Sequence, residues 1–214
     1  MSVVHHPDDE TLAAFSAGAL DLGQRIAVAT HLTACAHCRD WVRAMERVGG
    51  ALLAEAAPAA LASDALDRTL ARLDEPTPAV AARARTAKDL PSGLPRFVES
   101  YRFGGWRWVA PRVSLRPIVL PEASATRVFL LKAPAGVGLL RHDHTGPEMT
   151  CVLTGAFRHE GGRYGPGDFD FGDDTVNHEP RVEEGEDCVC LVAMQGDLRW
   201  SGWLGRLAQP FLRL

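Results

Sequence analysis

The sequence predicts an α+β protein of two domains, a small all-α domain followed by an all-β barrel. Residues 8–74 are rich in Ala, Leu, Arg and Glu, a composition that favours helices. Residues 76–95 contain four prolines and no recognisable element, which is typical of a linker. Beyond them, short apolar runs alternate with Gly and Pro, as strands alternate with turns. We therefore expect a helical domain over 1–75, a linker over 76–95 and a barrel over 96–214.

Four helices are expected in the first domain. They begin near Asp8, which is a plausible N-cap before Gly18 ends the helix, and near Asp21, His37 and Ser63. In the fourth helix Leu66, Leu70 and Leu73 fall on one face. Leucines at this spacing more often pack into a core than form a recognition surface, so we expect a core stripe. Three or four short helices nevertheless make a small core, which can leave apolar faces for a partner.

Charge and composition exclude some classes of function. The net charge of -4 and the pI near 6.1 argue against direct binding of nucleic acid, and residues 1–75 hold eleven acidic residues against six arginines and no lysine. Such a surface suits a basic protein partner, or it is simply a solvated face. No segment approaches the ~20 apolar residues that cross a membrane, and residues 1–7 lack the pattern of a signal peptide, so we expect a cytoplasmic protein.

The first metal-binding pattern lies where the second and third helices meet. His31 and Cys35 are one helical turn apart, and Cys38 follows three residues later at the start of a helix. Two thiolates and an imidazole suit a tetrahedral Zn²⁺ ion, with the fourth ligand from His5 or His6 and only Asp21 as a weaker alternative. A redox CxxC of the thioredoxin kind would need a βαβ context, and an incidental cysteine pair is the remaining alternative. His37 is expected to face solvent.

The second metal-binding pattern lies among the predicted strands. Residues 136–155 match G-x5-H-x-H-x3-E-x6-G and resemble the first cupin motif. His142 and His144 alternate along a strand and so point to the same side, into a barrel, and Glu148 returns there after a short turn. A second, looser motif adds His178. Three histidines and a glutamate can hold Zn²⁺, our first choice, or Fe²⁺, Mn²⁺ or Ni²⁺.

The remaining cysteines and histidine allow two interpretations. Cys188 and Cys190 also alternate along a strand, so that both could lie near the cupin metal and respond to oxidants, or they could be small core residues. Cys151 is expected to be core. His159 lies off the motif and is expected at the surface.

The combined arrangement resembles the ChrR family of anti-sigma factors over nearly the whole chain. His6, His31, Cys35 and Cys38 match the H-x24-H-x3-C-x2-C pattern of zinc-binding anti-sigma domains, and the resemblance implies that His6 rather than His5 is the fourth ligand. It also implies that the helical domain sequesters an extracytoplasmic-function sigma factor in a 1:1 complex. The cupin would then sense an oxidative signal, singlet oxygen or an organic peroxide, and promote release.

Two other classes of function remain open from the residues alone. Many cupins with such ligands are metal-dependent enzymes, dioxygenases or isomerases, and an open coordination position could serve catalysis. Arg141, Arg158 and Tyr164 could line the mouth of that barrel. A zinc module that binds DNA is the third possibility, but the acidic first third of the chain argues against it. We expect a regulator without enzymatic activity, bound neither to nucleic acid nor to a membrane.

Overall fold

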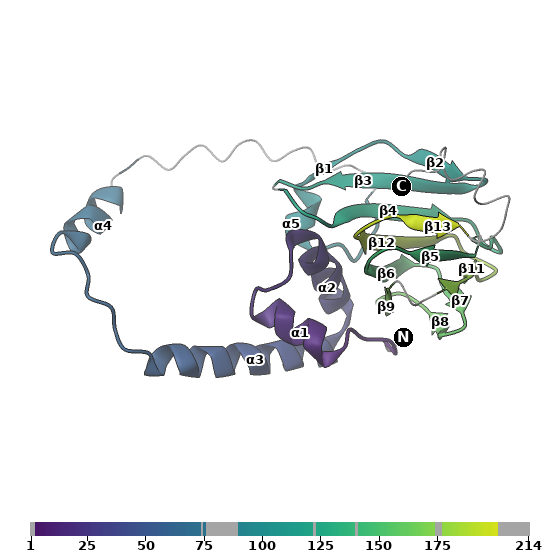
Figure 1. Cartoon of the computed structure of the whole chain (residues 1–214). Helices are drawn as coiled ribbons and strands as arrows, with labels where there is room; N and C mark the ends of the chain where they lie inside the picture. The colour runs from purple at the N-terminus through teal and green to yellow at the C-terminus, as the bar shows by residue number, and fades with distance from the viewer. Residues whose placement is uncertain are drawn as a thin grey trace.

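The structure is a computed structural model that describes residues 3–73, 75, 90–121, 123–139, 141–173 and 177–200 (Figure 1). Its helices are α1 (Asp9–Ser16), α2 (Leu22–Ala34), α3 (Ala36–Glu55), α4 (Ala65–Leu73) and the short α5 (Arg96–Glu99). None of these helices combines the length and the hydrophobicity that a bilayer-spanning segment needs. Most of the predicted linker, residues 76–89, lies outside the described residues. Its last part, residues 90–95, includes the buried Leu94.

The starts and ends of the first two helices follow from capping residues that the sequence shows. The Asp8 side chain accepts a hydrogen bond from the Thr11 N–H (2.7 Å), and Gly18 adopts a positive φ of 69° just past the end of α1. Asp21 and Gln24 form a reciprocal capping box at the start of α2. The four predicted helices are therefore confirmed.

The second half of the chain is a barrel of short antiparallel strands. They are β1 (Arg102–Phe103), β2 (Arg107–Ala110), β3 (Val113–Val119), β4 (Arg127–Ala133), β5 (His142–His144), β6 (Glu148–Thr154), β7 (Phe157–His159), β8 (Gly162–Tyr164), β9 (Phe169–Gly172), β10 (Asn177–His178), β11 (Arg181–Val182), β12 (Cys188–Met194) and β13 (Leu198–Trp200). The largest sheet runs β1-β3-β4-β12-β6-β9, with β2 beside β3, and the smaller sheets run β10-β5-β13 and β11-β7-β8. This confirms the predicted α+β class.

Helix α2 packs directly on the large sheet, so the helical region and the barrel share a hydrophobic core (Figure 1). Ile26 and Val28 of α2 are fully buried in one cluster with Leu130 and Leu191 of the sheet. Gly23 allows this close approach, because a Cβ there would lie 2.6 Å from the Thr126 side chain. The outer face of the sheet is therefore covered by the chain's own helix.

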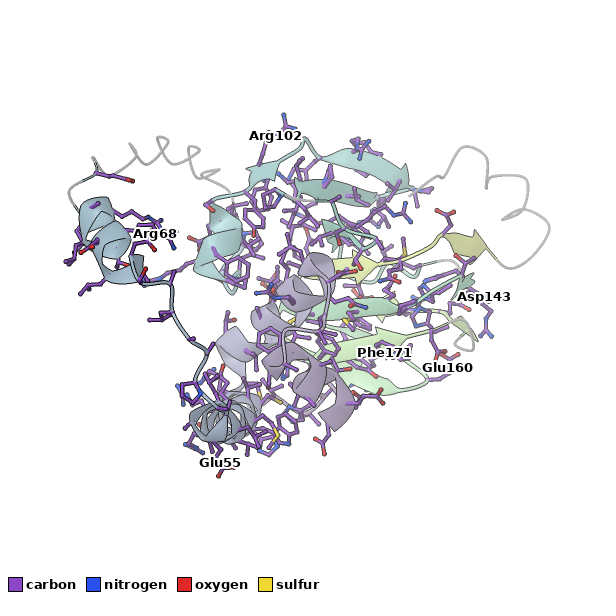
Figure 2. The ribbon with its side chains drawn as sticks, turned by 60° about the vertical axis from the view of Figure 1, so that its left-hand side comes forward. Glu55, Arg68, Arg102, Asp143, Glu160 and Phe171 are labelled. Atoms are coloured by element: carbon purple, nitrogen blue, oxygen red, sulfur yellow. The ribbon has the colours of Figure 1, made fainter. Side chains whose placement is uncertain are left out.

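The end of α3 and all of α4 extend away from this core. In Figure 2, Glu55 and Arg68 lie on the opposite side of the molecule from Asp143 and Glu160 of the barrel. Leu66, Leu70 and Leu73 are 68%, 51% and 76% exposed, and α4 contains no buried residue. The expectation that this stripe is core is wrong, because the helix lies too far from the sheet for any described residue to cover it.

Candidate metal centres

The first candidate centre lies where the N-terminal arm (residues 3–7) meets α2 and α3. The ligand atoms of His6, His31, Cys35 and Cys38 all lie within 4.8 Å of one another. His31 is in the last turn of α2, Cys35 is the residue between α2 and α3, and Cys38 is in the first turn of α3. His6 approaches from the arm, with Nδ1 3.4 Å from both sulfur atoms. His5 is not in this group, which agrees with the ligand implied by the resemblance.

The protonation of this cluster fits a bound cation. Burial lowers the pKa of His31 to about 4, so the imidazole stays neutral and keeps a lone pair for a metal. Burial and the contact with Cys35 raise the pKa of Cys38 to about 12, so in the metal-free chain this thiol keeps its proton. A metal ion that binds here must displace that proton. The set of two imidazoles and two thiols is one that structural zinc sites use.

The buried ring of His31 shows which of its nitrogens is available. Its Nδ1 lies 2.7 Å from the carbonyl oxygen of Gly167 in the barrel. Because a carbonyl can only accept, Nδ1 carries the proton and Nε2 has the free lone pair. That Nε2 has no hydrogen-bond partner although it is fully buried. A metal ion in the cluster would satisfy this atom.

The second candidate centre lies inside the barrel. His142 and His144 project from β5 and His178 from β10, which pairs with β5 so that His178 lies opposite His142. The Nε2 atom of His178 is 3.1 Å from those of both other histidines, and all three rings are buried. Burial and the neighbouring rings lower the pKa of His178 to about 4. Neutral imidazoles whose Nε2 atoms converge in this way are suited to hold one cation.

Glu148 lies beside these histidines but is not among the atoms that meet within 4.8 Å. One of its oxygens is 3.5 Å from Nδ1 of His144, and the other accepts a hydrogen bond from the Thr150 hydroxyl (3.1 Å). Burial raises the pKa of Glu148, which a nearby cation would lower again. The carboxylate is thus placed at the edge of the cluster, and its role as a ligand stays a prediction.

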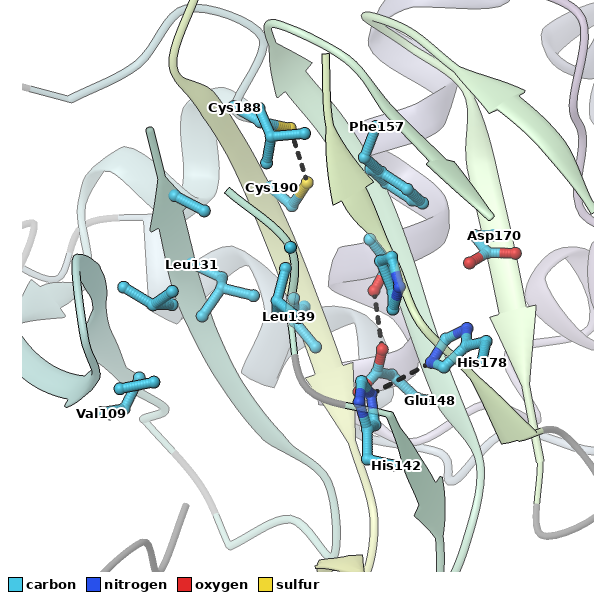
Figure 3. A pocket seen from close by; sticks show the side chains of 18 of the residues that line it. Val109, Leu131, Leu139, His142, Glu148, Phe157, Asp170, His178, Cys188 and Cys190 are labelled. Carbon is cyan, nitrogen blue, oxygen red and sulfur yellow. Dashed lines mark hydrogen bonds between the residues drawn. The ribbon is translucent and has the colours of Figure 1, made fainter. Parts of the chain in front are cut away.

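Beside this second centre the barrel encloses a cavity, which we call the chamber. It is a cavity of about 270 Å³, and His142, Glu148 and His178 are among its lining residues, together with Cys188 and Cys190 (Figure 3). The two sulfur atoms are 3.6 Å apart. Contact with Cys188 and burial raise the pKa of Cys190. The rest of the described lining is mainly aliphatic and aromatic and includes no Lys or Arg.

Two residues near this centre were missed by the sequence analysis. His159 is not at the surface: its side chain is only 8% exposed, and its Nε2 lies 3.1 Å from a carboxylate oxygen of Asp170. Nδ1 of His159 accepts a hydrogen bond from the Gly161 N–H, so Nε2 is the donor to Asp170. Asp170 lines the chamber. Neither residue belongs to a motif with fixed spacing, and they lie on strands of different sheets, β7 and β9, so the tertiary structure was needed to find them.

Comparison with known proteins agrees with this geometry. Residues 101–196 match the model of the ChrR cupin-like domain. The chain is 38% identical over 218 aligned residues to the anti-sigma-E factor ChrR of Cereibacter sphaeroides, and the alignment covers 100% of both chains. This chain belongs to the ChrR family of anti-sigma factors. The crystal structure of Rhodobacter sphaeroides SigE in complex with the anti-sigma ChrR has a TM-score of 0.74 and 34% identity, covering 91% of this chain and 100% of that chain.

Family membership supports a regulator rather than an enzyme. The structure also shows where the other residues considered in the sequence analysis lie. Cys151 is buried in the core, and the His37 side chain is exposed, as expected. Tyr164 does not line the mouth of the chamber. It is buried, and its ring stacks between those of His5 and His159, at centroid distances of 4.1 and 4.8 Å. The barrel therefore contacts the N-terminal arm through this tyrosine.

Proposed function

We propose that this chain is an anti-sigma factor that sequesters an extracytoplasmic-function sigma factor and thereby blocks its access to RNA polymerase. The observation that carries the proposal is the exposed apolar surface of α4 and of the end of α3, on a chain similar along its whole length to an anti-sigma factor. Leu52 and Leu53 on α3 are 64% and 76% exposed. A soluble chain seldom keeps so many exposed leucines on neighbouring helices unless a partner covers them. Because that partner acts on cytoplasmic RNA polymerase, we place the chain in the cytoplasm.

A metal ion in the first candidate centre would support this role by fixing the helices. We propose that His6, His31, Cys35 and Cys38 hold a structural Zn²⁺ ion, which would join the N-terminal arm, α2 and α3 at one point. The metal would set the angle at which α3 leaves the core and so the position of the docking surface. The acidic balance of residues 1–75 would favour a basic partner and disfavour DNA.

The decisive experiment is binding of an extracytoplasmic-function sigma factor of the SigE type, the kind of partner seen in the crystal structure of the similar ChrR. We expect a 1:1 complex in size-exclusion chromatography, and the variant with Leu66, Leu70 and Leu73 all changed to Ser should bind at least about 30-fold more weakly. These side chains are exposed, so the variant should fold normally. Trp108→Ser, which removes an equally exposed apolar side chain (75%) from the barrel, is the matched control. Absence of a complex with the unaltered chain would refute the proposal.

We further propose that the chamber senses the signal. His142, His144, His178 and Glu148 would hold a divalent metal, with Zn²⁺ as first candidate, beside the thiols of Cys188 and Cys190. Singlet oxygen and organic peroxides are small, uncharged oxidants that suit an apolar cavity. With a hydroperoxide ROOH, the two thiols would form a disulfide and release ROH and one water, so that the sulfurs are oxidised and the O–O bond is reduced.

Such a reaction would strain the sheet on which α2 lies. The sulfurs must close from 3.6 Å to the ~2.05 Å of a disulfide, and both belong to β12, the strand against which α2 packs. The test is release of the sigma factor from the purified complex by tert-butyl hydroperoxide. The variant with Cys188 and Cys190 changed to Ala should keep its partner, whereas Cys151→Ala, a buried thiol of the neighbouring strand, should release it normally. Equal release from both variants would exclude the thiol pair.

The metal-dependent enzyme remains the competing function for the barrel. The described chamber lining carries no cationic side chain that could anchor an anionic substrate, which favours a sensor. The metal-loaded chain would be incubated with candidate dioxygenase and isomerase substrates. Turnover that depends on His178 would instead support the enzyme.

A further inference from the structure

The barrel reaches the first metal centre through one tight turn. This turn, residues 164–169, connects β8 to β9 and lies against both the N-terminal arm and the end of α2; we call it the clamp turn. The arm carries His6 and α2 carries His31, so the clamp turn contacts both segments that supply histidine ligands. The first candidate metal centre is therefore built partly by the barrel.

Asp168 holds the arm by its backbone. Its Oδ1 accepts hydrogen bonds from the N–H groups of Val4 (2.6 Å) and His5 (2.9 Å), and its Oδ2 accepts one from Gly165 (2.8 Å) within the turn. The next residue, Phe169, donates its N–H to the carbonyl of His5 (3.1 Å). Asp168 is only 5% exposed, so these bonds are shielded from water. They fix the backbone immediately before His6.

Gly167 holds the second histidine. Its carbonyl accepts the Nδ1–H of His31 (2.7 Å), which fixes the ring with Nε2 toward the cluster. Gly167 has a φ of 88°, and a Cβ there would lie 2.7 Å from the Ala34 side chain and 2.9 Å from that of Val3. Only glycine lets the turn approach α2 and the arm so closely. Hydrogen bonds of this kind to the second nitrogen of a ligating histidine orient the ring and raise metal affinity.

We propose that the clamp turn is a working part of the first metal centre: Asp168 and the Gly167 carbonyl position His6 and His31, so that metal binding by the helical region and docking of the barrel stabilise each other. The proposal rests on the four metal ligands but not on any sigma factor. Such thermodynamic linkage is reciprocal. A substitution that weakens the hydrogen bonds of the clamp turn must weaken metal binding, and loss of the metal must weaken those hydrogen bonds. The clamp turn continues into β9, whose Asp170 lines the chamber, so it also joins the two candidate metal centres.

The first test uses the full-length chain loaded with Co²⁺, whose thiolate charge-transfer absorption reports only cysteine-bound metal. The variant with both Cys35 and Cys38 changed to Ser should abolish this band and so assign it to the first centre rather than to Cys188 and Cys190. Chelator-driven loss of the band should be about 10- to 100-fold faster in Asp168→Ala, and intermediate in Asp168→Asn, which keeps one acceptor oxygen. Asp187→Ala, which removes an exposed carboxylate paired with Lys132 elsewhere in the barrel, should match the unaltered chain. Unchanged loss of metal in a folded Asp168→Ala chain overturns the proposal.

The second test needs no substitution in the clamp and so remains decisive if Asp168→Ala does not fold. Hydrogen exchange of the Val4, His5 and Phe169 amides, which all donate within the clamp, is followed in the unaltered chain before and after removal of the thiolate-bound metal. We expect exchange at these amides to accelerate at least about 10-fold, while the Leu191 amide in the core of β12 stays protected. Equal protection with and without the metal contradicts the linkage. Since no partner protein is present, failure here is separate from failure of the proposed function.

Discussion

Helices α2 and α4 are both short and polar on one side, but the chain uses them in opposite ways. Helix α2 buries Ile26, Ala27 and Val28 in the core that it shares with the barrel, whereas α4 leaves every leucine exposed. The more clearly amphipathic helix is the exposed one. An apolar stripe therefore indicates that a helix packs against another surface. It does not indicate whether that surface belongs to the same chain or to a partner. The first candidate metal centre lies where α2 meets α3, and α3 leads from this inner part of the chain toward α4.

The largest effect should follow from breaking that connection. Cys38→Ser removes one of the proposed thiolate ligands at the start of α3. If these residues hold a structural metal, we expect its loss and at least about 100-fold weaker binding of the sigma factor, because metal binding supplies folding free energy in small sites. Elemental analysis measures the metal content, and calorimetric titration measures the affinity for the sigma factor. His178→Ala, which removes a histidine of the chamber, should change sigma binding by less than about 3-fold. Strong loss in both variants would mean that the two centres do not act separately.

The contrast between the helices predicts that a substitution in α2 lowers stability, whereas a substitution in α4 weakens binding of the sigma factor. Ile26→Ala should lower the free energy of unfolding by about 2–5 kcal/mol, because it leaves a cavity between α2 and the sheet. Leu70→Ala should change it by less than about 0.5 kcal/mol, since that side chain is exposed, yet it should weaken sigma binding. Urea denaturation and binding titration are measured on each variant. A large loss of stability in Leu70→Ala would show that α4 packs on its own chain.

The metal-free chain should lose stability in mild acid. Burial lowers the pKa of His178 to about 4, so the folded chain keeps this ring neutral while the unfolded chain takes up a proton below about pH 6.5. The contribution of neutral His178 to the free energy of unfolding is therefore fully present above pH 6.5 and is lost as the pH falls toward 4. We expect a loss of about 2 kcal/mol between pH 7 and pH 5. Urea denaturation of the metal-free chain at both pH values measures it. His178→Gln should reduce the pH dependence by that amount, and an unchanged slope would contradict the assignment.

The smallest expected effects distinguish two helix caps. Asp8 caps only α1, whereas the Asp21 carboxylate caps α2 and also accepts hydrogen bonds from Thr126 (2.5 Å) and Gln195 (3.1 Å) of the barrel. Asp8→Ala should cost about 1 kcal/mol and Asp21→Ala about 2 kcal/mol or more, since the second change also breaks bonds between α2 and the barrel. Thermal denaturation compares them. Equal losses would mean that the bonds to Thr126 and Gln195 add nothing.

Much of the fold could be predicted from the sequence because its signals are local, and both candidate metal clusters could be predicted because their residues match spacing motifs. Caps at Asp8 and Asp21 mark the helix starts, and alternation along β5 brings His142 and His144 to one side. His6, His31, Cys35 and Cys38 were predicted together through a spacing pattern, and the structure does bring them together. The exposure of α4 and the burial of His159 were not predicted, because both depend on which distant segment covers a side chain.

The sequence by itself determined the order of the elements and the separation of a helical region from a barrel, since helix capping and strand alternation act over a few residues. The candidate ligands followed from spacing motifs and from the family resemblance, which implies His6 rather than His5. Only the tertiary structure decided that α2 covers the sheet, that Glu148 lies at the edge of its cluster, and that Asp168 and Gly167 hold the N-terminal arm and His31. The hydrogen bond from the Val4 N–H to Asp168, for example, joins residues 164 positions apart. Such contacts arise because chain packing, rather than local preference, determines which distant backbone groups meet.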